Sequence, residues 1–501
     1  MLTVDTWFGE LMHLPDIPGH RAMQDPDAVM VTDDTTAYTA AGFDTAVVRA
    51  ARVLAAAGLT RGTVAAVVLP NTADLVIALF AAWRLGAAAT PVNPALGRHE
   101  IAYQLADCSS QVVVTIPELT AVMPQGHQVV TDLHATADPG DPLAGYDVLA
   151  DADDLALLIY TSGTTGKPKG VMLDHANLTA MVDSSIAEMS MDSTAHSLLI
   201  LPLFHVNGIV AGVMSALAAG GQTTIAGRFD PLTLFDRVEA ARPTYFSAVP
   251  AIYAMLVDLP ETVAPDTSSL RYVICGAAPA SPELLRRFET RYGVPVIEGY
   301  GLSEGTCAST LNPVDGPRKP GTVGRAMPGQ TVRIVDTDGQ TITDGRPGEV
   351  LIQGPTVLRG YLGRPEETAT TLVDGWLHTG DVGQLDEDGY LTLVDRSKDM
   401  IIRNGENIYP REIESVVYRL DGVREAAVVG RPHPTRGEEP VLFVSLNRES
   451  DLSDEVIDEH IAEHLAKYKR PVTITTVDDI PKNPVGKIDK PSLRRQVAPV
   501  S

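Results

Sequence analysis

The sequence predicts an α/β protein with largely parallel sheets, and three observations lead to that fold class. Short apolar runs alternate with longer amphipathic segments early in the chain, the alternation returns after residue 220, and it occurs again near the C-terminus. Strands that alternate with helix-length segments are joined by crossovers, which place helices on the faces of parallel sheets. The length of 501 residues exceeds what one compact core usually holds, so two or more domains are expected.

The first series has three strand-like runs separated by two helix-like segments, at residues 64–69, 73–84, 88–92, 99–106 and 112–116. In the second series the strand-like runs lie at residues 223–226, 245–248 and 271–275, and the helix-like segments lie at residues 231–241 and 282–292. We therefore expect two helix-covered, mostly parallel sheets in one large N-terminal domain.

A different pattern begins at residue 312. Segment 312–329 is rich in Pro and Gly, and the strand-like TVRIVD and GEVLIQG that follow predict a β-rich subdomain. The C-terminal part returns to α/β, with helix-like segments at 410–420 and 453–466 and strand-like runs at 425–429 and 441–446. This part is expected to form a small α/β domain of its own.

The chain is acidic, because 39 Lys and Arg stand against 64 Asp and Glu, for a net charge of −25. Such a surface disfavours non-specific binding to nucleic acid or to anionic membranes, which requires basic patches. The three cysteines, Cys108, Cys275 and Cys307, are too few and too scattered for a disulfide framework or a tetrahedral zinc site.

Neither a signal peptide nor a membrane span is predicted. The N-terminal MLTVDTWFGELMH contains two acidic residues and lacks a basic region, and Asn71, Asp74 and Arg84 interrupt the most apolar early region, 64–92. A soluble, cytoplasmic protein is therefore expected, with no nucleic-acid partner and no integral membrane segment. Whether it is a monomer or a homodimer is left open.

The segment YTSGTTGKPKG, residues 160–170, directly follows an apolar run. Glycines let backbone N–H groups approach a polyanion, hydroxyls add donors and Lys adds charge, so the composition suits the phosphates of a nucleotide. A P-loop is excluded, because Thr161 stands where its first Gly is needed and Pro168 follows Lys167. An ordinary solvated loop is the alternative on composition alone.

Four further segments carry matching chemistry: EGYGLSE at 298–304, WLHTGD at 376–381, DRSKD at 395–399 leading into IIRNGENIYPREIE, and NPVGKI at 483–488. A Tyr between glycines can lie against a flat base, and the Glu304 carboxylate is a hard ligand for Mg²⁺. The Asp381 carboxylate, after a tight turn, can accept both hydroxyls of a ribose. The five segments in this order resemble the acyl-adenylate-forming enzymes, which include acyl-CoA synthetases, coumarate-CoA ligases, luciferases and the adenylation domains of peptide synthetases.

The resemblance spans residues 27–495 and implies ATP, Mg²⁺ and coenzyme A as cofactors. It implies a mobile phosphate loop over 161–169, an adenine site at 276–279 and 298–301 with Tyr300 stacked on the base, ribose contacts from Asp381 and Arg396, and Glu304 as the metal ligand. The nucleotide-binding residues implied are Thr161, Ser162, Gly163, Thr164, Thr165, Gly166, Lys169, Gly276, Ala277, Ala278, Glu298, Gly299, Tyr300, Gly301, Ser303, Asp381 and Arg396. Ser303 replaces the Thr of many members and keeps the hydroxyl.

Lys487 matches the lysine that contacts the carboxylate and the α-phosphate during adenylation. Attack of a carboxylate on a phosphate brings two anions together, so an ammonium group and Mg²⁺ at that point lower the barrier. An exposed lysine of a C-terminal tail is the alternative reading of Lys487.

The resemblance divides the chain into an N-terminal AMP-binding domain, 1–395, and a mobile C-terminal domain, 396–501. Lys398 matches the hinge about which the C-terminal domain rotates between half-reactions, withdrawing Lys487 and bringing loop 405–407 to the site. Asn404 replaces a common Gly in that region, and Asn tolerates a left-handed backbone better than most residues.

The acyl pocket implied by the resemblance is lined by His205, Asn207, Ala211, Ala248, Val249, Ala277, Ala278, Gly299, Gly301, Cys307 and Ala308. Most of these are small and apolar, which favours a medium-sized apolar or aromatic acid. Asn207 stands where coumarate-type ligases have Tyr, which disfavours a hydroxycinnamate, and Gly299 stands where malonate-activating relatives have Arg, which disfavours a dicarboxylate. A satisfied core histidine is the alternative reading of His205.

The predicted enzyme is an ATP-dependent acid–CoA ligase that forms acyl-AMP, releases pyrophosphate and transfers the acyl group to coenzyme A. Transfer to an amine or to a carrier protein remains an alternative, as does a non-catalytic relative that binds nucleotide or acyl ligand. Basic residues that could meet the CoA diphosphate are Arg403, Arg436, Lys467, Lys469 and Arg470, although each is more often a solvated surface charge.

Overall fold

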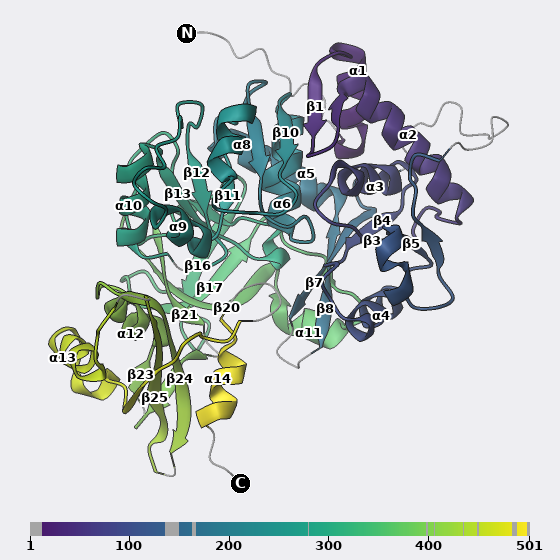
Figure 1. The fold of residues 1–501 in the computed structure, drawn as a ribbon. Coiled ribbons are helices and arrows are strands. Elements are labelled where there is room, and N and C mark those ends of the chain that lie inside the picture. Colours follow the sequence, from purple (N-terminus) through teal and green to yellow (C-terminus); the bar gives the residue numbers. More distant parts are fainter. Residues whose placement is uncertain are drawn as a thin grey trace.

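The computed structural model describes residues 13–135, 150–162, 167–278, 280–396, 399–404, 406–433, 435–447, 450–482 and 488–497, with the backbone alone at 162, 396 and 407. Figure 1 shows a large body, coloured purple to light green, and a small C-terminal body at its lower left, coloured yellow-green to yellow. The predicted α/β class and the division into a large and a small part are both confirmed.

The first sheet has seven strands in the order β18-β8-β7-β4-β3-β5-β6, of which β7, β4, β3, β5 and β6 are parallel. Their bounds are β3 Val64–Val68, β4 Ala88–Pro91, β5 Val112–Thr115, β6 Gln128–Val130, β7 Leu155–Ser162, β8 Pro168–Asp174 and β18 Gly360–Tyr361. Helix α3, Ala73–Arg84, packs on this sheet under α2, Ala40–Ala56, so it is buried on all sides except at Asp74. A helix covered on both faces must be largely apolar, as ADLVIALFAAWR is, and its buried Arg84 is paired with Asp44 at 2.9 Å.

The second sheet is built from two parts. β2 Ala37–Thr39, β1 Val29–Thr32, β10 Gln222–Ile225 and β9 His196–Leu199 form one part, and β11 Ser247–Ala248, β12 Val273–Cys275, β13 Val296–Tyr300, β14 Thr310–Leu311 and β15 Arg325–Ala326 form the other. A parallel bridge between Ser197 and Tyr245 connects them. Parallel strands β11, β12 and β13 lead into an antiparallel edge, and β13 carries the EGY sequence.

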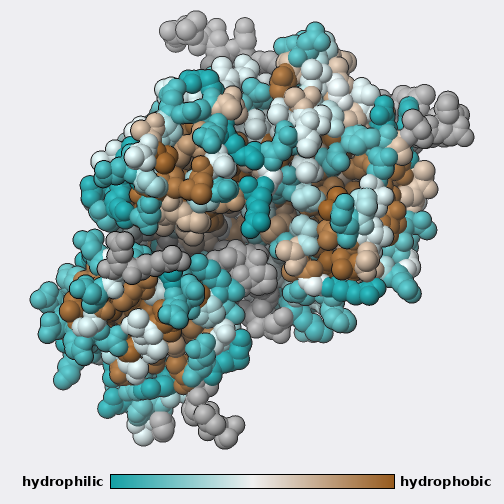
Figure 2. Space-filling view, viewed as in Figure 1, coloured by the Kyte–Doolittle hydropathy of each residue, from teal (hydrophilic) through white to brown (hydrophobic). Residues whose placement is uncertain are grey.

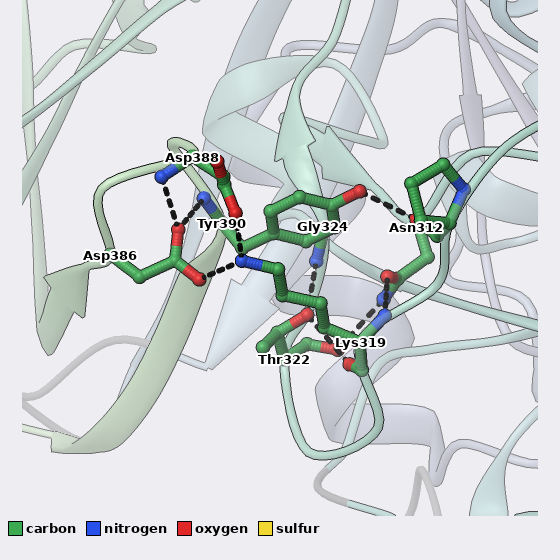
Figure 3. A network of polar contacts seen from close by, with 8 residues as sticks. Asn312, Lys319, Thr322, Gly324, Asp386, Asp388 and Tyr390 are labelled. Carbon is green, nitrogen blue, oxygen red and sulfur yellow. Dashed lines mark hydrogen bonds and ion pairs between the residues drawn. The ribbon is translucent and has the colours of Figure 1, made fainter.

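The third sheet is the predicted β-rich subdomain, and its strands are antiparallel: β16 Thr331–Val335, β17 Gly348–Gln353, β19 Leu372–Val373, β20 Trp376–Leu385 and β21 Leu391–Arg396. Lys319 joins the preceding Pro/Gly-rich segment to this sheet, since its Nζ lies 2.6 Å from both Asp386 Oδ2 and Asp388 Oδ2 (Figure 3). Asn312 Nδ2 in the same network donates to the carbonyls of Thr322 and Glu298, so the network also reaches β13.

The C-terminal sheet contains β22 Ile401–Arg403, β23 Glu406–Ile408, β24 Val423–His433, β25 Gly437–Leu446 and β26 Thr473–Thr476. Long strands β24 and β25 alternate their side chains between two apolar clusters. One cluster contains Val428 and Leu442 and is covered by α12 Pro410–Val417 and α13 Asp454–His464, and the other contains Val429 and Phe443 and is covered by α14 Lys490–Val497. Successive side chains of these strands therefore point to opposite faces of the sheet, and both faces are covered by helices.

The remaining helical elements are η1 Leu14–Asp16, α1 Ile17–Gln24, α4 Arg98–Asp107, η2 Pro117–Val122, α5 His175–Glu188, α6 Val206–Ile209, η3 Val210–Met214, α7 Ser215–Ala218, α8 Leu234–Ala241, α9 Pro250–Val257, α10 Pro282–Tyr292, η4 Ser303–Gly305, α11 Pro365–Thr371 and η6 Lys467–Lys469. The predicted helices 73–84 and 282–292 are observed with the same bounds. Helix 231–241 begins later, at Leu234, because Asp230 holds the amide of Leu232 in a turn. Within the described part of the chain, no helix is long and apolar enough to cross a membrane, and the cytoplasmic location stays a prediction.

Candidate active site

The described residues of the predicted phosphate loop, 161–162 and 167–169, lie where the β7–β8 hairpin strands end and begin. Strands β7 and β8 are antiparallel, with Thr161 opposite Lys169 and Ser162 opposite Pro168. Gly163, Thr164, Thr165 and Gly166, together with the side chain of Ser162, lie outside the described residues. The hairpin therefore brings the hydroxyl-bearing end of one strand next to the lysine of the other.

Lys169 is held on two sides. Its Nζ lies 2.9 Å from Glu367 Oε2 of α11 and 4.0 Å from the centroid of the Tyr361 ring, and its side chain is 14% exposed. An ammonium group over an aromatic face is attracted by the ring quadrupole. The position of this lysine is thus fixed by two residues that the sequence analysis did not single out.

Tyr361 also contacts the predicted metal ligand, since its hydroxyl donates a hydrogen bond to Glu304 Oε1 at 2.9 Å. Burial and the Glu304 charge raise the pKa of Tyr361, so the hydroxyl keeps its proton and remains a donor. Glu304 itself lies in the short helix η4 with Ser303. One tyrosine therefore links the hairpin lysine and the η4 carboxylate.

Tyr300 and Asp381 meet directly. The Tyr300 hydroxyl donates to Asp381 Oδ2 at 2.5 Å, and both residues are buried, at 8% and 6% exposure. Asp381 on β20 also lies opposite Arg396 on β21 in the strand register. Side chains from β13 and β20 that are predicted to contact adenine and ribose therefore meet, and the backbone of Arg396 on β21 lies opposite Asp381.

A strained turn follows Tyr300. Thr306 and Cys307 both have positive φ, 55° and 102°, and the amide of Ser309 donates to the Tyr300 carbonyl at 2.8 Å. A Cβ built on Gly301 would overlap the Cys307 carbonyl oxygen. Only Gly fits at 301 without moving the turn, and backbone strain of this kind is concentrated at functional sites.

Glu298 stands on β13, two residues before Tyr300, and faces Arg411 of the C-terminal domain. It is 6% exposed, and burial raises the pKa of its carboxyl to about 7, although the Arg411 charge and the Ala280 amide oppose the rise. Arg411, at the start of α12, also lies near Asp381 and Asp395, and its amide donates to Asp395 Oδ2 at 2.9 Å. The small domain thus presents a guanidinium group to the predicted nucleotide site.

The adenine-site segments approach each other closely. A Cβ at Gly276 would lie 3.3 Å from the Gly299 carbonyl, and one at Gly299 would lie 2.6 Å from Leu311 Cδ1 and 3.0 Å from the Thr310 carbonyl. Ala277 has φ 65° and, like Ala278, is exposed. The short distance at Gly299 explains why no side chain extends from this position.

The predicted acyl-pocket residues come from α6, η3, the β11–α9 junction, the segment after β12, strand β13 and the strained turn. Asn207 Nδ2 lies 3.7 Å from Cys307 Sγ, Ala211 is 7% exposed in η3, and Val249 caps α9. Asn207 Oδ1 is buried and has no hydrogen-bond partner among the described residues. His205 caps α6 with its ring centroid 4.6 Å from that of Phe204, and Ala308 is half-buried beside Cys307. Asn207 and Cys307 are thus in contact although 100 residues separate them.

Comparison with known proteins identifies the family. The family model described as AMP-binding enzyme matches residues 19–362, and the model described as AMP-binding enzyme C-terminal domain matches residues 412–487. The chain belongs to the AMP-binding enzyme family.

Relatives agree with this family membership. The chain is 36% identical over 485 residues to a feruloyl-CoA synthase of Amycolatopsis sp., covering 96% of this chain and 98% of the relative. ATP-bound MatB from Rhodopseudomonas palustris superposes with a TM-score of 0.90 at 31% identity, covering 97% and 98% of the two chains, whereas apo MatB gives 0.80. The o-succinylbenzoate CoA synthetase MenE from Bacillus subtilis in complex with its acyl-adenylate intermediate gives 0.87 at 30% identity, covering 96% and 98%.

Two residues with predicted catalytic roles, Lys487 and Lys398, lie outside the described residues, as do Gly405 and the side chains of Arg396 and Asn407. Asn404 has φ 53°, the left-handed conformation that Asn tolerates. Two surface hollows of about 410 and 510 Å³ are lined by residues outside the candidate site.

Sequence reasoning missed Tyr361, Glu367 and Arg411. Arg411 stands in the quoted run YPREIE, and a basic residue beside that helix start was the available signal. Tyr361 and Glu367 follow one another closely in GYLGRPEE, but nothing local connects that run to residues 169 or 304. Only the pairing of β18 with β8 brings them there.

Proposed function

We propose that this AMP-binding family member is an ATP-dependent acid–CoA ligase. It activates a carboxylic acid as acyl-AMP with release of pyrophosphate, and then transfers the acyl group to coenzyme A. The observation that carries the proposal is that predicted site residues are joined in pairs in a chain of this family, since Tyr361 contacts both Lys169 and Glu304 and the Tyr300 hydroxyl donates to Asp381.

In this proposal the nucleotide lies between the hairpin and β20. Asp381 and Arg396 bind the ribose, Tyr300 and segments 276–278 and 298–301 surround the adenine, and the hairpin hydroxyls with Lys169 and Ser303 contact the phosphates. Because Lys169 is paired with Glu367, bound phosphate has to compete with that carboxylate. Glu304 fits Mg²⁺, since its carboxylate is a hard ligand oriented by the Tyr361 hydroxyl. When bound, the ion would supply positive charge to the phosphates.

Lys487 is proposed to hold the acid carboxylate against the α-phosphate, and His205 to position the acid. The pocket residues Asn207, Ala211, Val249, Gly301, Cys307 and Ala308 are small, which supports a medium-sized apolar or aromatic acid. Relatives at 36% identity include both a feruloyl-CoA synthase and a long-chain-fatty-acid–CoA ligase, which matches this choice between an aromatic and an apolar acid. A donor on such an acid could satisfy Asn207 Oδ1.

The proposed domain boundary is 395/396, with Lys398 as the hinge. The TM-score is 0.90 against ATP-bound MatB and 0.80 against the apo form of the same protein, at 31% identity in both cases. Since the sequence compared is the same, the difference reflects conformation. We therefore assign the arrangement seen here, with Arg411 facing Glu298, to a nucleotide-bound state.

Coenzyme A is the proposed acceptor, and a basic cluster in the small domain supports it. Arg403, Arg431 and Arg436 surround the buried Glu439 at 3.6, 3.3 and 3.0 Å, so three guanidinium groups share one carboxylate and suit a diphosphate. Lys469 is instead paired with Glu412 at 2.7 Å, and Arg470 donates to two carbonyls. Transfer to an amine or a carrier protein is the second possibility.

Acid-dependent exchange of labelled pyrophosphate into ATP tests the first half-reaction before any acceptor is added. Exchange with at least one acid of a broad panel is expected, and none with any acid would favour a non-catalytic relative. Repeating the panel with CoA and with free amines, and detecting thioester or amide by mass, identifies the acceptor.

Two variants separate the half-reactions. Lys487→Ala is expected to slow adenylate formation far more than transfer from preformed adenylate, because its contact belongs to the first arrangement only. Lys398→Pro fixes the hinge φ and is expected to do the reverse. Equal losses in both steps for Lys487→Ala would contradict the rotation.

A further inference from the structure

Helix α13 carries a group of metal-binding side chains outside the proposed active site. His460, Glu463 and His464 stand at positions i, i+3 and i+4, which share one face of a helix, and their ligand atoms all lie within 4.8 Å of one another. The two imidazole rings lie side by side with centroids 4.3 Å apart.

Backbone carbonyls fix which nitrogen of each ring carries the proton. His460 Nε2 lies 3.1 Å from the Val416 carbonyl and His464 Nδ1 lies 2.8 Å from the His460 carbonyl. A carbonyl can only accept, so each of these nitrogens donates and the other nitrogen of each neutral ring, His460 Nδ1 and His464 Nε2, keeps its lone pair. Metal-binding histidines are usually oriented by such a bond from the second nitrogen.

The local charge also favours a cation. Helix α13 contains Asp454, Glu455, Asp458, Glu459 and Glu463 and no Lys or Arg. It lies at the outer edge of the small domain, away from the large body, and the surface over it is hydrophilic (Figures 1 and 2). Glu463 is exposed, and its carboxylate can rotate to the separation of about 3.3 Å that tetrahedral zinc ligands require.

We propose that His460, Glu463 and His464 bind a divalent transition-metal ion of the zinc class. Two imidazole nitrogens with one carboxylate suit Zn²⁺, Ni²⁺ or Cu²⁺ and do not suit Mg²⁺, which prefers oxygen ligands, so this site is chemically distinct from the one proposed at Glu304. Because His460 is hydrogen-bonded to the end of α12, a bound ion would tie α13 to α12 and stabilise the small domain.

Zinc titration of the full-length protein against a chromophoric chelator, in excess Mg²⁺, tests the proposal. The wild type is expected to bind one more equivalent of Zn²⁺ than His464→Ala or His460→Ala, and Glu463→Gln is expected to bind more weakly. His99→Ala, which removes an exposed histidine on α4, is the matched control and should keep the full stoichiometry. Identical stoichiometry in the wild type and His464→Ala would overturn the proposal.

Thermal unfolding gives a second readout that does not depend on activity. Zn²⁺ is expected to raise the unfolding temperature of the wild type and of His99→Ala but not that of His464→Ala. His464→Gln keeps the polarity of the exposed position and serves if the alanine variant folds poorly. An equal zinc-induced shift in all four proteins would also overturn the proposal.

Discussion

The Tyr300 hydroxyl donates a hydrogen bond to Asp381 Oδ2 at 2.5 Å, across 81 residues of sequence. The bond joins β13 of the second sheet to β20 of the third, and both partners are buried. The orientation of the carboxylate proposed to bind ribose therefore depends on the tyrosine proposed to stack on adenine.

Tyr300→Phe keeps the ring and removes this bond. We expect the KM for ATP in pyrophosphate exchange to rise about tenfold, because a hydrogen bond to a charged group contributes about 1.5 kcal/mol or more. Tyr300→Ala, which also removes the ring, should raise the KM for ATP further. An unchanged KM in the phenylalanine variant would show that Asp381 is oriented by other contacts.

Tyr361→Phe tests the link to Glu304. Loss of the hydroxyl leaves Glu304 less well oriented, so the Mg²⁺ concentration that gives half-maximal exchange should rise, by about tenfold on the scale of other ligand-orienting contacts. Tyr418→Phe is the matched control, because its hydroxyl is also hydrogen-bonded but to the Ala426 backbone in the small domain. Equal Mg²⁺ requirements in the two variants would remove Tyr361 from this role.

Gly301→Ala tests the tight turn. The added Cβ would overlap the Cys307 carbonyl, so we expect a destabilisation of about 1–3 kcal/mol and loss of exchange activity. Gly19→Ala is the control, since its Cβ would meet nothing closer than 3.5 Å and Ala favours a helix. Full activity in Gly301→Ala would mean that the turn can move at no cost.

His175 predicts an acid-sensitive fold. It is fully buried, its ring nitrogens have no hydrogen-bond partner among the described residues, and burial lowers its pKa from 6.5 to about 3. Below pH 6.5 the His175 imidazole is protonated in the unfolded chain but stays neutral in the folded chain. The unfolding free energy that is present above pH 6.5 is therefore lost as the pH falls toward 3.

Between pH ~7.5 and ~5 the wild type should lose about 2 kcal/mol more unfolding free energy than His175→Phe, by urea denaturation. The phenylalanine keeps the packing against Trp83, where the two ring centroids are 5.5 Å apart. His99→Phe, at an exposed position, should leave the pH dependence unchanged. Parallel curves for the wild type and His175→Phe would refute the assignment.

The buried Glu298 carboxyl predicts a pH dependence of stability opposite in sign to that of His175. Burial raises the pKa of its carboxyl from 4.5 to about 7, so stability that is fully present below pH 4.5 is lost as the pH rises toward 7. Between pH ~4.5 and ~8 the unfolding free energy of Glu298→Gln should therefore rise relative to that of the wild type by up to about 3 kcal/mol. A constant difference across that range in urea denaturation would argue against the raised pKa.

Local periodicity correctly predicted two helices whose apolar or amphipathic pattern is clear. Segments 73–84 and 282–292 became α3 and α10 with the same bounds, because an apolar stretch of helical length, or an amphipathic one with Pro282 at its start, has one low-energy solution. Strand 245–248 was observed only as Ser247–Ala248, because strand bounds depend on which neighbour supplies hydrogen bonds.

The alternation of short apolar runs with longer amphipathic segments was enough to predict the α/β class. The order and chemistry of five short segments were enough to predict the family and the kind of reaction, since residue types such as Tyr between glycines or Lys among hydroxyls suit a particular ligand. Tertiary structure alone decided that Tyr300 would bond to Asp381, that Tyr361 would connect Lys169 with Glu304, and that Arg411 would face Glu298. The physical reason is that such contacts arise from strand pairing and domain placement between residues far apart in sequence. The local sequence around each residue does not encode which distant partner it will meet.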